Sequence, residues 1–440
     1  MSTDPSSTKS AAAPHDCGCP DFTRAGVSRR SLFKTAAALS GGVVMTQMFG
    51  ESMLQASFAG SAGAGGNTLV VLSLRGGIDG LGVVVPHGDA GYYSARPNTA
   101  IPAASLICAD SSFGLHPKMA PLAKFWTSGE LAAVQAVGLP VPNRSHFSAI
   151  EAVEDAAPGS SARSGWINRM IGLSSSHTDP RCLDAVQLGM DFPTTAISGD
   201  APTLSATSVK GLQLTGVDSP YSQSRYGSMN TMWGGNDGPL SEGVRDALSI
   251  SQGPGSALNL VASRATAVYP TATNAAPFSA PLQSAAALIR ADLGTEVIAI
   301  DAGSWDFHSG YGSLSSGSMV STVDGLAQSL GAFLDDLGPL RSRVTVATIS
   351  EFGRRVSENG SQGFDHGWGN MMLLVGAGVK GGRYYGTWPG LNPSALADGD
   401  LKVTTDYRNI LGEIVTRRFV GRSLAETFPG LSYAPLGLMS

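Results

Sequence analysis

Three histidines stand in short polar segments beside carboxylates, a serine or an arginine. The segments are Asn143-Arg144-Ser145-His146-Phe147, Trp305-Asp306-Phe307-His308 and Asp365-His366-Gly367. Imidazole and carboxylate together form a donor set that suits Zn²⁺, Mn²⁺ or Fe²⁺ in proteins. A serine and an arginine where a helix begins are suited to an anionic group. These residue types make the three segments candidates for metal binding and for anion chemistry.

Short apolar runs predict the strands that would position these segments. They are residues 68–74, 131–137, 185–188, 296–300, 344–349 and 371–375. Such runs are typical of strands buried on both faces of a parallel sheet. Apolar residues recur at helical spacing over residues 320–337 and predict an amphipathic crossover helix. The order of strand, helix and strand favours a doubly wound α/β fold with a mostly parallel sheet and helices on both faces.

Polar residues follow several of these runs directly. Arg75 and Asp79 follow the first run, Asp301 follows the fourth, and Glu351 and Arg354 follow the fifth. In open α/β sheets, functional residues collect on the loops at the carboxyl ends of the strands. The scarce charges of the chain are therefore expected around one candidate site.

Composition excludes several classes of protein. Charged residues make up 14% of the chain and 56 of its 440 residues are glycine, against about 25% and about 7% in an average soluble protein. A hydrophobic content of 42% argues against disorder, and a net charge of −5 without a basic block argues against nucleic acid as a partner. Beyond the N-terminal region no apolar run approaches about 18 residues, so no stable transmembrane segment is predicted in the mature chain.

Residues 194–281 are poor in charge and rich in Ser, Gly, Thr, Ala and Pro. This composition predicts long loops or a cap-like insertion rather than a second core. Residues 251–256 and 270–281 have the composition of flexible connectors, so disorder is the alternative there.

The N-terminal region has the order of an export signal. The segment Ser28-Arg29-Arg30-Ser31-Leu32-Phe33-Lys34 resembles the twin-arginine motif, and apolar and then small residues follow it. We expect residues 1–64 to be the signal and processing region and residues 65–440 to form one domain. The twin-arginine translocase would deliver the folded protein, with any metal already bound, to the periplasm or the exterior. The alternative is a buried helix with a basic cap.

The four cysteines are too few for a disulfide scaffold. Cys17 and Cys19 would leave with the leader. Cys108 and Cys182 remain, either as a disulfide or as two separate buried thiols.

Five short blocks of the chain resemble those of a known family. They are Leu-Arg-Gly-Gly-Ile-Asp-Gly from Leu74, Asn-Arg-Ser-His-Phe from Asn143, Trp-Asp-Phe-His from Trp305, Ser-Glu-Phe-Gly-Arg from Ser350, and Asp-His-Gly from Asp365. These are similar to the signature blocks of the exported domain-of-unknown-function family numbered 1501, which is grouped with the alkaline phosphatase and sulfatase superfamily. The resemblance covers nearly the whole chain. It implies a sheet of alkaline-phosphatase-like type with two metal ions, a nucleophile, and Asp and His ligands on strand-end loops.

Carried over to this chain, the superfamily pattern implies a catalytic group of Ser145, Arg144 and His146. Ser145 matches the nucleophile position, where Arg144 and the helix N-terminus would receive a phosphoryl or sulfuryl group. The resemblance also implies one metal site made of His308, His366 and either Asp306 or Asp301. Zn²⁺ or Mn²⁺ suits that site. Asp365 would either bind the metal itself or orient His366.

The second implied metal site departs from the superfamily pattern. It would need Asp79, Ser145 and Glu351, and Phe352 stands where the superfamily has a histidine ligand. This site is expected to be empty, to hold Mg²⁺ or Ca²⁺, or to be replaced by Arg75 and Arg354 as fixed positive charge that binds anions.

The resemblance implies a metal-dependent hydrolase or transferase that acts on phosphate or sulfate esters, either small molecules or polymers. The alternative is a non-catalytic envelope or secretion scaffold that keeps the fold. A redox protein has little support, because no haem, iron–sulfur or dinucleotide motif is visible. Structural alternatives also stand for single residues: Ser145 as a helix N-cap, Arg354 in surface ion pairs, and loop histidines that bond only the backbone.

Overall fold

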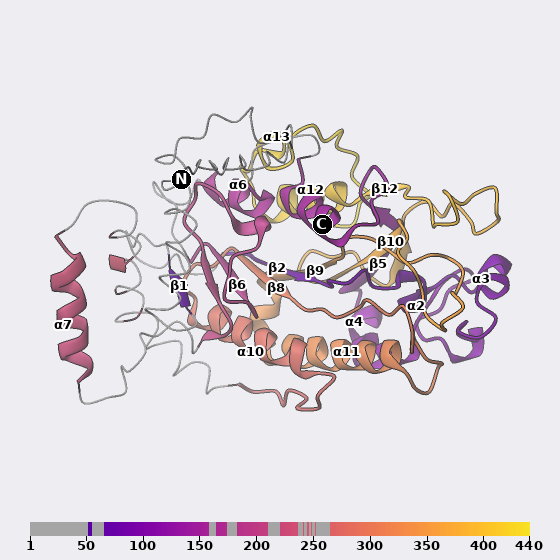
Figure 1. Cartoon of the computed structure of the whole chain (residues 1–440), viewed down its shortest axis with the longest axis horizontal. Helices are drawn as coiled ribbons and strands as arrows, with labels where there is room; N and C mark the ends of the chain where they lie inside the picture. The colour runs from indigo at the N-terminus through magenta and orange to yellow at the C-terminus, as the bar shows by residue number, and fades with distance from the viewer. Residues whose placement is uncertain are drawn as a thin grey trace, which may run out of the picture. The chain divides into compact units, whose positions relative to one another are not determined.

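The apolar run at Thr68 forms β2 (Thr68–Ser73), which lies inside a ten-stranded sheet (Figure 1). The computed structural model describes residues 52–54, 66–157, 164–173, 183–209, 221–235, 241, 244–245, 248, 251 and 265–440. The strands follow the order β1-β7-β6-β8-β2-β9-β10-β5-β11, and β12 also pairs with β5. The other strands are β1 (Ser52–Leu54), β5 (Leu131–Gly138), β6 (Ala185–Leu188), β7 (Leu204–Ala206), β8 (Val297–Asp301), β9 (Val344–Ile349), β10 (Asn370–Gly376), β11 (Arg383–Tyr385) and β12 (Thr405–Asp406).

Strand direction decides which loops meet. β7, β6, β8, β2 and β9 are parallel neighbours, whereas β10 is antiparallel to both β9 and β5. β5 therefore runs in the same direction as β9. The predicted mostly parallel sheet is confirmed, and β10 is the exception among the six predicted strands. Residues 350–369 carry the chain from β9 to β10 along one edge of the sheet, so no crossover helix is needed.

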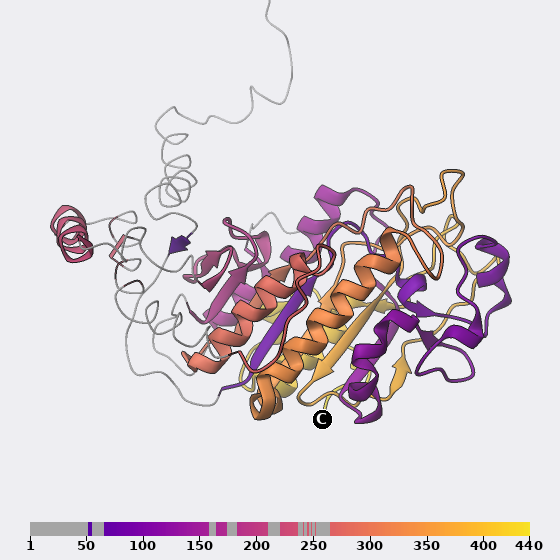
Figure 2. The same ribbon diagram turned by 90° about the horizontal axis from the view of Figure 1, so that it is seen from below.

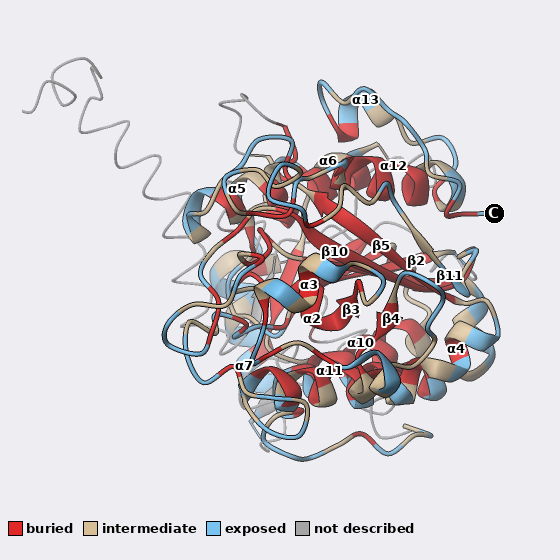
Figure 3. Ribbon diagram, turned by 90° about the vertical axis from the view of Figure 1, so that its right-hand side faces the viewer, coloured by how far each residue is buried: buried red, intermediate tan, exposed pale blue. Residues whose placement is uncertain are grey.

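Helices cover both faces of the sheet, because successive side chains of each strand point to opposite faces. In β2, Leu72 packs with α4 (Ala123–Thr127), α10 (Ala276–Ala291) and α11 (Ser318–Leu337), while Val71 packs with the opposite layer. That layer holds α5 (His146–Asp155), α6 (Trp166–Gly172), α12 (Tyr407–Arg418) and α13 (Leu424–Thr427). Figure 2 shows α10 and α11 side by side across one face, and in Figure 3 the strands between the layers are buried. The doubly wound α/β class is confirmed.

Shorter elements connect these layers. They are α2 (Gly80–Val83), β3 (Val84–Val85), α3 (Ala90–Ala95), η2 (Ala103–Ser105), β4 (Gly114–Leu115), η3 (Pro117–Leu122), η4 (Thr195–Ile197), α7 (Ser222–Trp233) and η6 (Gly338–Arg343). β3 and β4 form a separate two-stranded antiparallel sheet. Within the described part of the chain, no helix combines the length and apolar character needed to cross a membrane.

The stretch 194–281, expected to be rich in loops, also contributes regular structure. It holds β7, α7 and the start of α10. The alternative of disorder at residues 270–281 is wrong for the part that lies in α10: this helix begins at Ala276 with a proline in its first turn, where a missing N–H costs nothing. The crossover helix predicted over residues 320–337 is α11.

Some predictions fall outside the described residues. The twin-arginine motif lies there, as do residues 252–256. Cys182 lies there too, and Cys108 is a half-buried free thiol among the described residues.

Candidate metal centre

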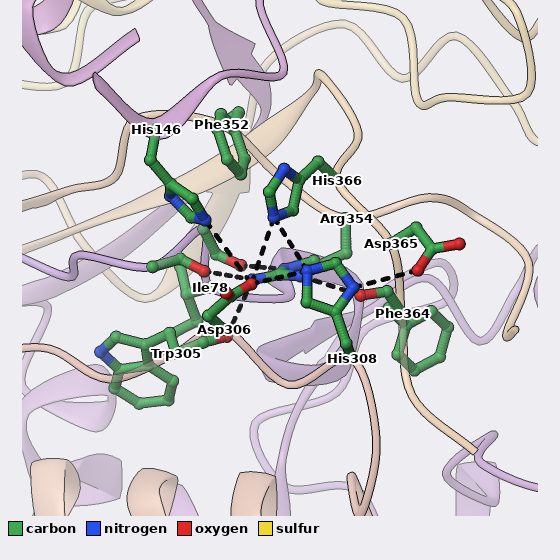
Figure 4. A network of polar contacts seen from close by, with 12 residues as sticks. Ile78, His146, Trp305, Asp306, His308, Phe352, Arg354, Phe364, Asp365 and His366 are labelled. Atoms are coloured by element: carbon green, nitrogen blue, oxygen red, sulfur yellow. Dashed lines mark hydrogen bonds and ion pairs between the residues drawn. The ribbon is translucent and has the colours of Figure 1, made fainter. Parts of the chain in front are cut away.

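Four loops meet at the carboxyl edge of the sheet, because β5, β8, β2 and β9 all end there. The loop after β5 leads to His146 at the start of α5, and the loop after β8 carries Asp306 and His308. His366 lies on the connection from β9 to β10. Figure 4 shows the four side chains turned toward one another. The sequence-predicted Asp306, His308 and His366 thus come together, and His146 joins them.

One carboxylate oxygen is the centre of this cluster. Oδ1 of Asp306 lies 3.0 Å from Nε2 of His308, 3.2 Å from Nε2 of His366 and 3.6 Å from Nε2 of His146. The Nε2 atoms of His308 and His366 are 3.0 Å apart. Three imidazole nitrogens and one oxygen therefore converge on a small volume.

The other nitrogen of each ring bonds to an oxygen. Nδ1 of His146 lies 2.8 Å from Oε1 of Glu351, Nδ1 of His308 lies 3.0 Å from Oδ1 of Asp365, and Nδ1 of His366 lies 2.8 Å from the Arg144 carbonyl. A carbonyl or an ionised carboxylate only accepts hydrogen bonds, so each Nδ1 carries the proton. In a neutral ring this leaves the lone pair on Nε2, which faces the cluster.

This arrangement fits a divalent metal. Nε2 of His146 is a buried atom without a hydrogen-bond partner. In neutral rings, the Nε2 lone pairs of His308 and His366 would face each other and repel. A proton shared between the two atoms, or a bound cation, would remove this repulsion. Ligand atoms of His146, Asp306 and His366 all lie within 4.8 Å of one another. Histidines that bind metals commonly donate their second N–H to a carboxylate or carbonyl, as all three do here.

Arg354 keeps Asp306 ionised. Its Nη2 donates to Oδ1 of Asp306 at 2.6 Å. Partial burial favours the neutral carboxyl, but the Arg354 guanidinium and the histidines outweigh it and lower the pKa of Asp306 to about 2. Arg354 is itself buried and also donates to the carbonyls of Gly77 at 2.6 Å and Phe364 at 2.8 Å. These hydrogen bonds connect three loops. Arg354 therefore stabilises the site and is not free to bind an anion.

Phe352, which has no ligand atom, forms a wall of the cluster. Its ring centroid lies 4.8 Å from those of both His146 and His366. Gly77 adopts φ +65° directly beside this ring, and a Cβ at that position would lie 2.5 Å from it. The close approach explains why a glycine precedes Ile78 in this turn.

Asp301 and Arg75 engage each other instead of joining the cluster. Arg75 forms ion pairs with Asp301 and with Glu154. Burial raises the pKa of Glu154 to about 7 although Arg75 opposes this. Of the two alternatives from sequence, the structure brings Asp306 and not Asp301 to the histidines. Arg75 is paired with these two carboxylates, so it is not free to bind an anion.

Asp79 lies in a buried ion pair. Nη1 and Nη2 of Arg96 donate to its two oxygens at 2.6 and 2.9 Å, and the Tyr311 hydroxyl donates at 2.6 Å. Glu351 accepts from the Gly76 N–H at 2.8 Å and orients His146. The second metal site implied by Asp79, Ser145 and Glu351 is therefore not assembled, because Asp79 and Glu351 have other partners.

Ser145 and Arg144 stand at the rim. Ser145 is the N-cap residue of α5 by position, yet its exposed side chain makes no capping hydrogen bond. Nε of Arg144 donates to Asp400 at 2.8 Å, and its Nη2 donates to Asp398 at 3.0 Å. Arg144 thus acts on the site through its carbonyl, which fixes His366.

Sequence reasoning missed Arg96, Asn359 and Asp400. Arg96 and Asp400 find their partners only through the tertiary fold, so no local signal marks them. Asn359 stands beside Gly360 in a turn-like stretch six residues before Asp365, and that was the one available signal. His116 has a structural role: its Nδ1 accepts from the Lys118 N–H at 3.0 Å, and burial lowers its pKa to about 4.

Comparisons with known proteins place the chain in a family. A comparison with curated proteins finds no match. Among solved structures, the chain is similar to the PsFucS1 sulfatase from Pseudoalteromonas sp., with 12% identity over 80% of this chain and 68% of that chain and a TM-score of 0.31. It is also similar to the alkaline phosphatase from the Antarctic bacterium TAB5, with 9% identity over 73% and 95% of the two chains and a TM-score of 0.29.

The lipoteichoic acid synthase LtaP from Listeria monocytogenes matches with 10% identity over 83% of this chain and 80% of that chain, with a TM-score of 0.28. The match to a family is of another kind, because it compares the sequence itself with a family model, and it covers most of the chain. Residues 102–413, which include all four cluster residues, match the family described as "Protein of unknown function (DUF1501)". The chain belongs to this family.

Proposed function

We propose that the protein binds one divalent metal ion, Zn²⁺ or Mn²⁺, through His146, His308, His366 and Asp306, and that it hydrolyses or transfers phosphate or sulfate esters. One observation carries the metal site: three Nε2 atoms converge on Oδ1 of Asp306 while each Nδ1 is held by an oxygen acceptor. The donor set of imidazoles and one carboxylate suits these ions.

The chain's own residues would prepare this site. Arg354 holds Asp306 in its ionised form, Glu351 keeps the proton on Nδ1 of His146, and Phe352 excludes water from one side. When bound, such an ion supplies a Lewis acid for a phosphoryl or sulfuryl oxygen and lowers the pKa of bound water. Ser145 offers a free hydroxyl at the rim, as nucleophile or as a contact to the anion.

Metal analysis tests the site. Purified protein reconstituted with Zn²⁺ should retain roughly one ion per chain after dialysis. His308→Ala and His366→Ala should lose it. His87→Ala is the matched control, because within the described part of the chain that ring bonds only the Asp110 carbonyl, at 2.9 Å. Failure of the reconstituted wild-type protein to retain metal would rule the site out.

An ester panel then tests the reaction. The ester class is supported by the resemblance of the five sequence blocks to the family numbered 1501, which is grouped with the alkaline phosphatase and sulfatase superfamily. Loaded protein should cleave or transfer at least one class among phosphate and sulfate mono- and diesters. With Ser145 as nucleophile, Ser145→Ala should lower kcat by on the order of a hundredfold or more. Activity that survives in Ser145→Ala would leave the serine at most an anion contact.

A non-catalytic scaffold is the second candidate, and a specific observation favours it. Arg75, Arg144 and Arg354 all pair with carboxylates, and Asp79 is bound by Arg96. An anionic substrate would find none of these arginines free. Stoichiometric metal without turnover of any ester in the panel would support this alternative.

Export remains part of the proposal. The twin-arginine segment supports delivery to the periplasm or the exterior by the twin-arginine translocase. Replacing both Arg29 and Arg30 by lysine should leave the protein in the cytoplasm in cell fractionation. Equal periplasmic amounts of variant and wild type would contradict this route.

A further inference from the structure

Asn359 organises a tight turn with its side-chain oxygen. Oδ1 accepts from the Ser361 N–H at 2.9 Å and from the Gly363 N–H at 3.0 Å. The Asn359 N–H also donates to the Gly363 carbonyl at 2.9 Å. An asparagine side chain that bonds the backbone two residues further on is typical of turns. The Oδ1 atom of Asn359 therefore stabilises the turn itself.

The other half of the amide reaches the histidine cluster. Nδ2 of Asn359 donates to the carbonyl of His308 at 3.0 Å and to Oδ1 of Asp365 at 2.9 Å. Asp365 uses the same oxygen to accept from Nδ1 of His308. One carboxylate oxygen of Asp365 therefore accepts from both Asn359 and His308.

Close backbone contact fixes the turn against the segment that carries His308. A Cβ on Gly363 would lie 2.3 Å from the carbonyl carbon of His308, and the Phe364 N–H donates to the Phe307 carbonyl at 3.0 Å. The Asn359 amide is therefore held at a set position relative to the His308 ring.

We infer that Asn359 is a positioning residue that keeps the proton on Nδ1 of His308 by holding Asp365 in place. The Asp365 side chain is 59% exposed, so without Asn359 water would compete for it. With Asn359 present, Nδ1 of His308 stays bonded to Asp365, and Nε2 stays directed at Asp306 and His366. This inference concerns the ring of His308 itself; its consequence for metal affinity rests on the proposed function.

The first test reads the proton directly. In protein labelled with ¹⁵N at histidine, the Nδ1–H signal of His308, assigned through His308→Gln, should be protected from exchange with water. Asn359→Ala should speed this exchange at least tenfold or remove the signal. Ser361→Ala is the matched control and should leave the signal unchanged, because Ser361 serves the turn with its main-chain N–H. An unchanged His308 signal in folded Asn359→Ala overturns the inference.

Asn359→Asp separates positioning from folding. It keeps the oxygen that accepts from Ser361 and Gly363 and removes the Nδ2 donor. Asn359→Asp should also lose the protected Nδ1–H signal of His308. If Asn359→Ala does not fold, Asn359→Asp takes its place in the test. Retention of the signal in folded Asn359→Asp also overturns the inference.

Metal affinity gives a second readout. Competition with a chromophoric chelator should show about 10- to 100-fold weaker Zn²⁺ binding in Asn359→Asp, as is typical when a group that orients a ligand is lost. The affinity of Ser361→Ala should equal that of wild type, and wild-type affinity in Asn359→Asp counts against the inference. Wild-type protein that binds no Zn²⁺ refutes the proposed function, and the His308 signal then decides this inference alone.

Discussion

Glu351 acts on the cluster through a single hydrogen bond to His146. Glu351→Gln preserves the shape of the side chain but weakens the acceptor that holds the proton on Nδ1. We expect Zn²⁺ affinity about 10- to 100-fold below wild type in chelator competition. Glu151→Gln, on the exposed side of α5, is the control and should bind as wild type. Undiminished affinity in Glu351→Gln would show that His146 needs no such support.

Glu154 makes stability depend on pH. Its pKa rises from 4.5 in the unfolded chain to about 7 in the fold, mainly through burial. Because the fold favours the protonated carboxyl, this group's contribution to the free energy of unfolding is full below pH 4.5 and is lost as pH rises toward about 7. The loss is at most about 3 kcal/mol.

Urea unfolding measures this effect. Wild type should lose more stability than Glu154→Gln between about pH 4.5 and pH 7, because glutamine does not ionise. Identical pH dependence in the two proteins would contradict the assignment to Glu154.

At the scale of elements, the turn after β2 and the connection from β9 to β10 are fitted to each other. Gly77→Ala would drive a methyl group into Phe352 and shift the wall behind His146 and His366. Gly338→Ala is matched, since Gly338 also has positive φ but nothing within 4 Å of its Cβ position. Both variants carry backbone strain, and Gly77→Ala should cost about 1–3 kcal/mol more because of overpacking.

Thermal unfolding and Zn²⁺ titration distinguish the two glycine variants. Gly77→Ala should show the lower Tm and weaker Zn²⁺ binding, while Gly338→Ala keeps wild-type affinity. Equal Tm and equal affinity would mean that the contact with Phe352 has no effect on the site.

Asp79 ties α2 to α3 through Arg96. Asp79→Asn leaves the Arg96 guanidinium buried without its charge partner, which should cost about 3–5 kcal/mol of stability in urea unfolding. Because the hydrogen bonds of Asp79 go to Arg96 and Tyr311 and not to a histidine of the cluster, metal stoichiometry should be unchanged. Loss of metal from folded Asp79→Asn would restore Asp79 as a ligand.

At the scale of the whole molecule, sequence pattern predicts what depends on local order. Buried runs and helical spacing predict β2, β9 and α11, and strand-end position predicts that Asp306, His308 and His366 meet. The partners of Arg75 and Asp79 could not be predicted, because Glu154 and Arg96 reach them only through the tertiary fold. The same holds for the antiparallel direction of β10, which depends on a long connection without regular periodicity.

His146 shows the limit of motif transfer. Its block suggested a catalytic group with Ser145 and Arg144, whereas the structure turns its ring toward Asp306 and turns Arg144 toward Asp400. The strand order made this possible, since β5 and β9 end at one edge although β10 separates them.

X-ray absorption at the zinc edge of the reconstituted protein tests the central claim most directly. The account predicts three imidazole nitrogens and at least one oxygen at about 2.0–2.1 Å from one Zn²⁺ per chain, and one imidazole fewer in His146→Ala. A wild-type spectrum without imidazole scattering, or an unchanged spectrum in His146→Ala, would contradict the metal centre described.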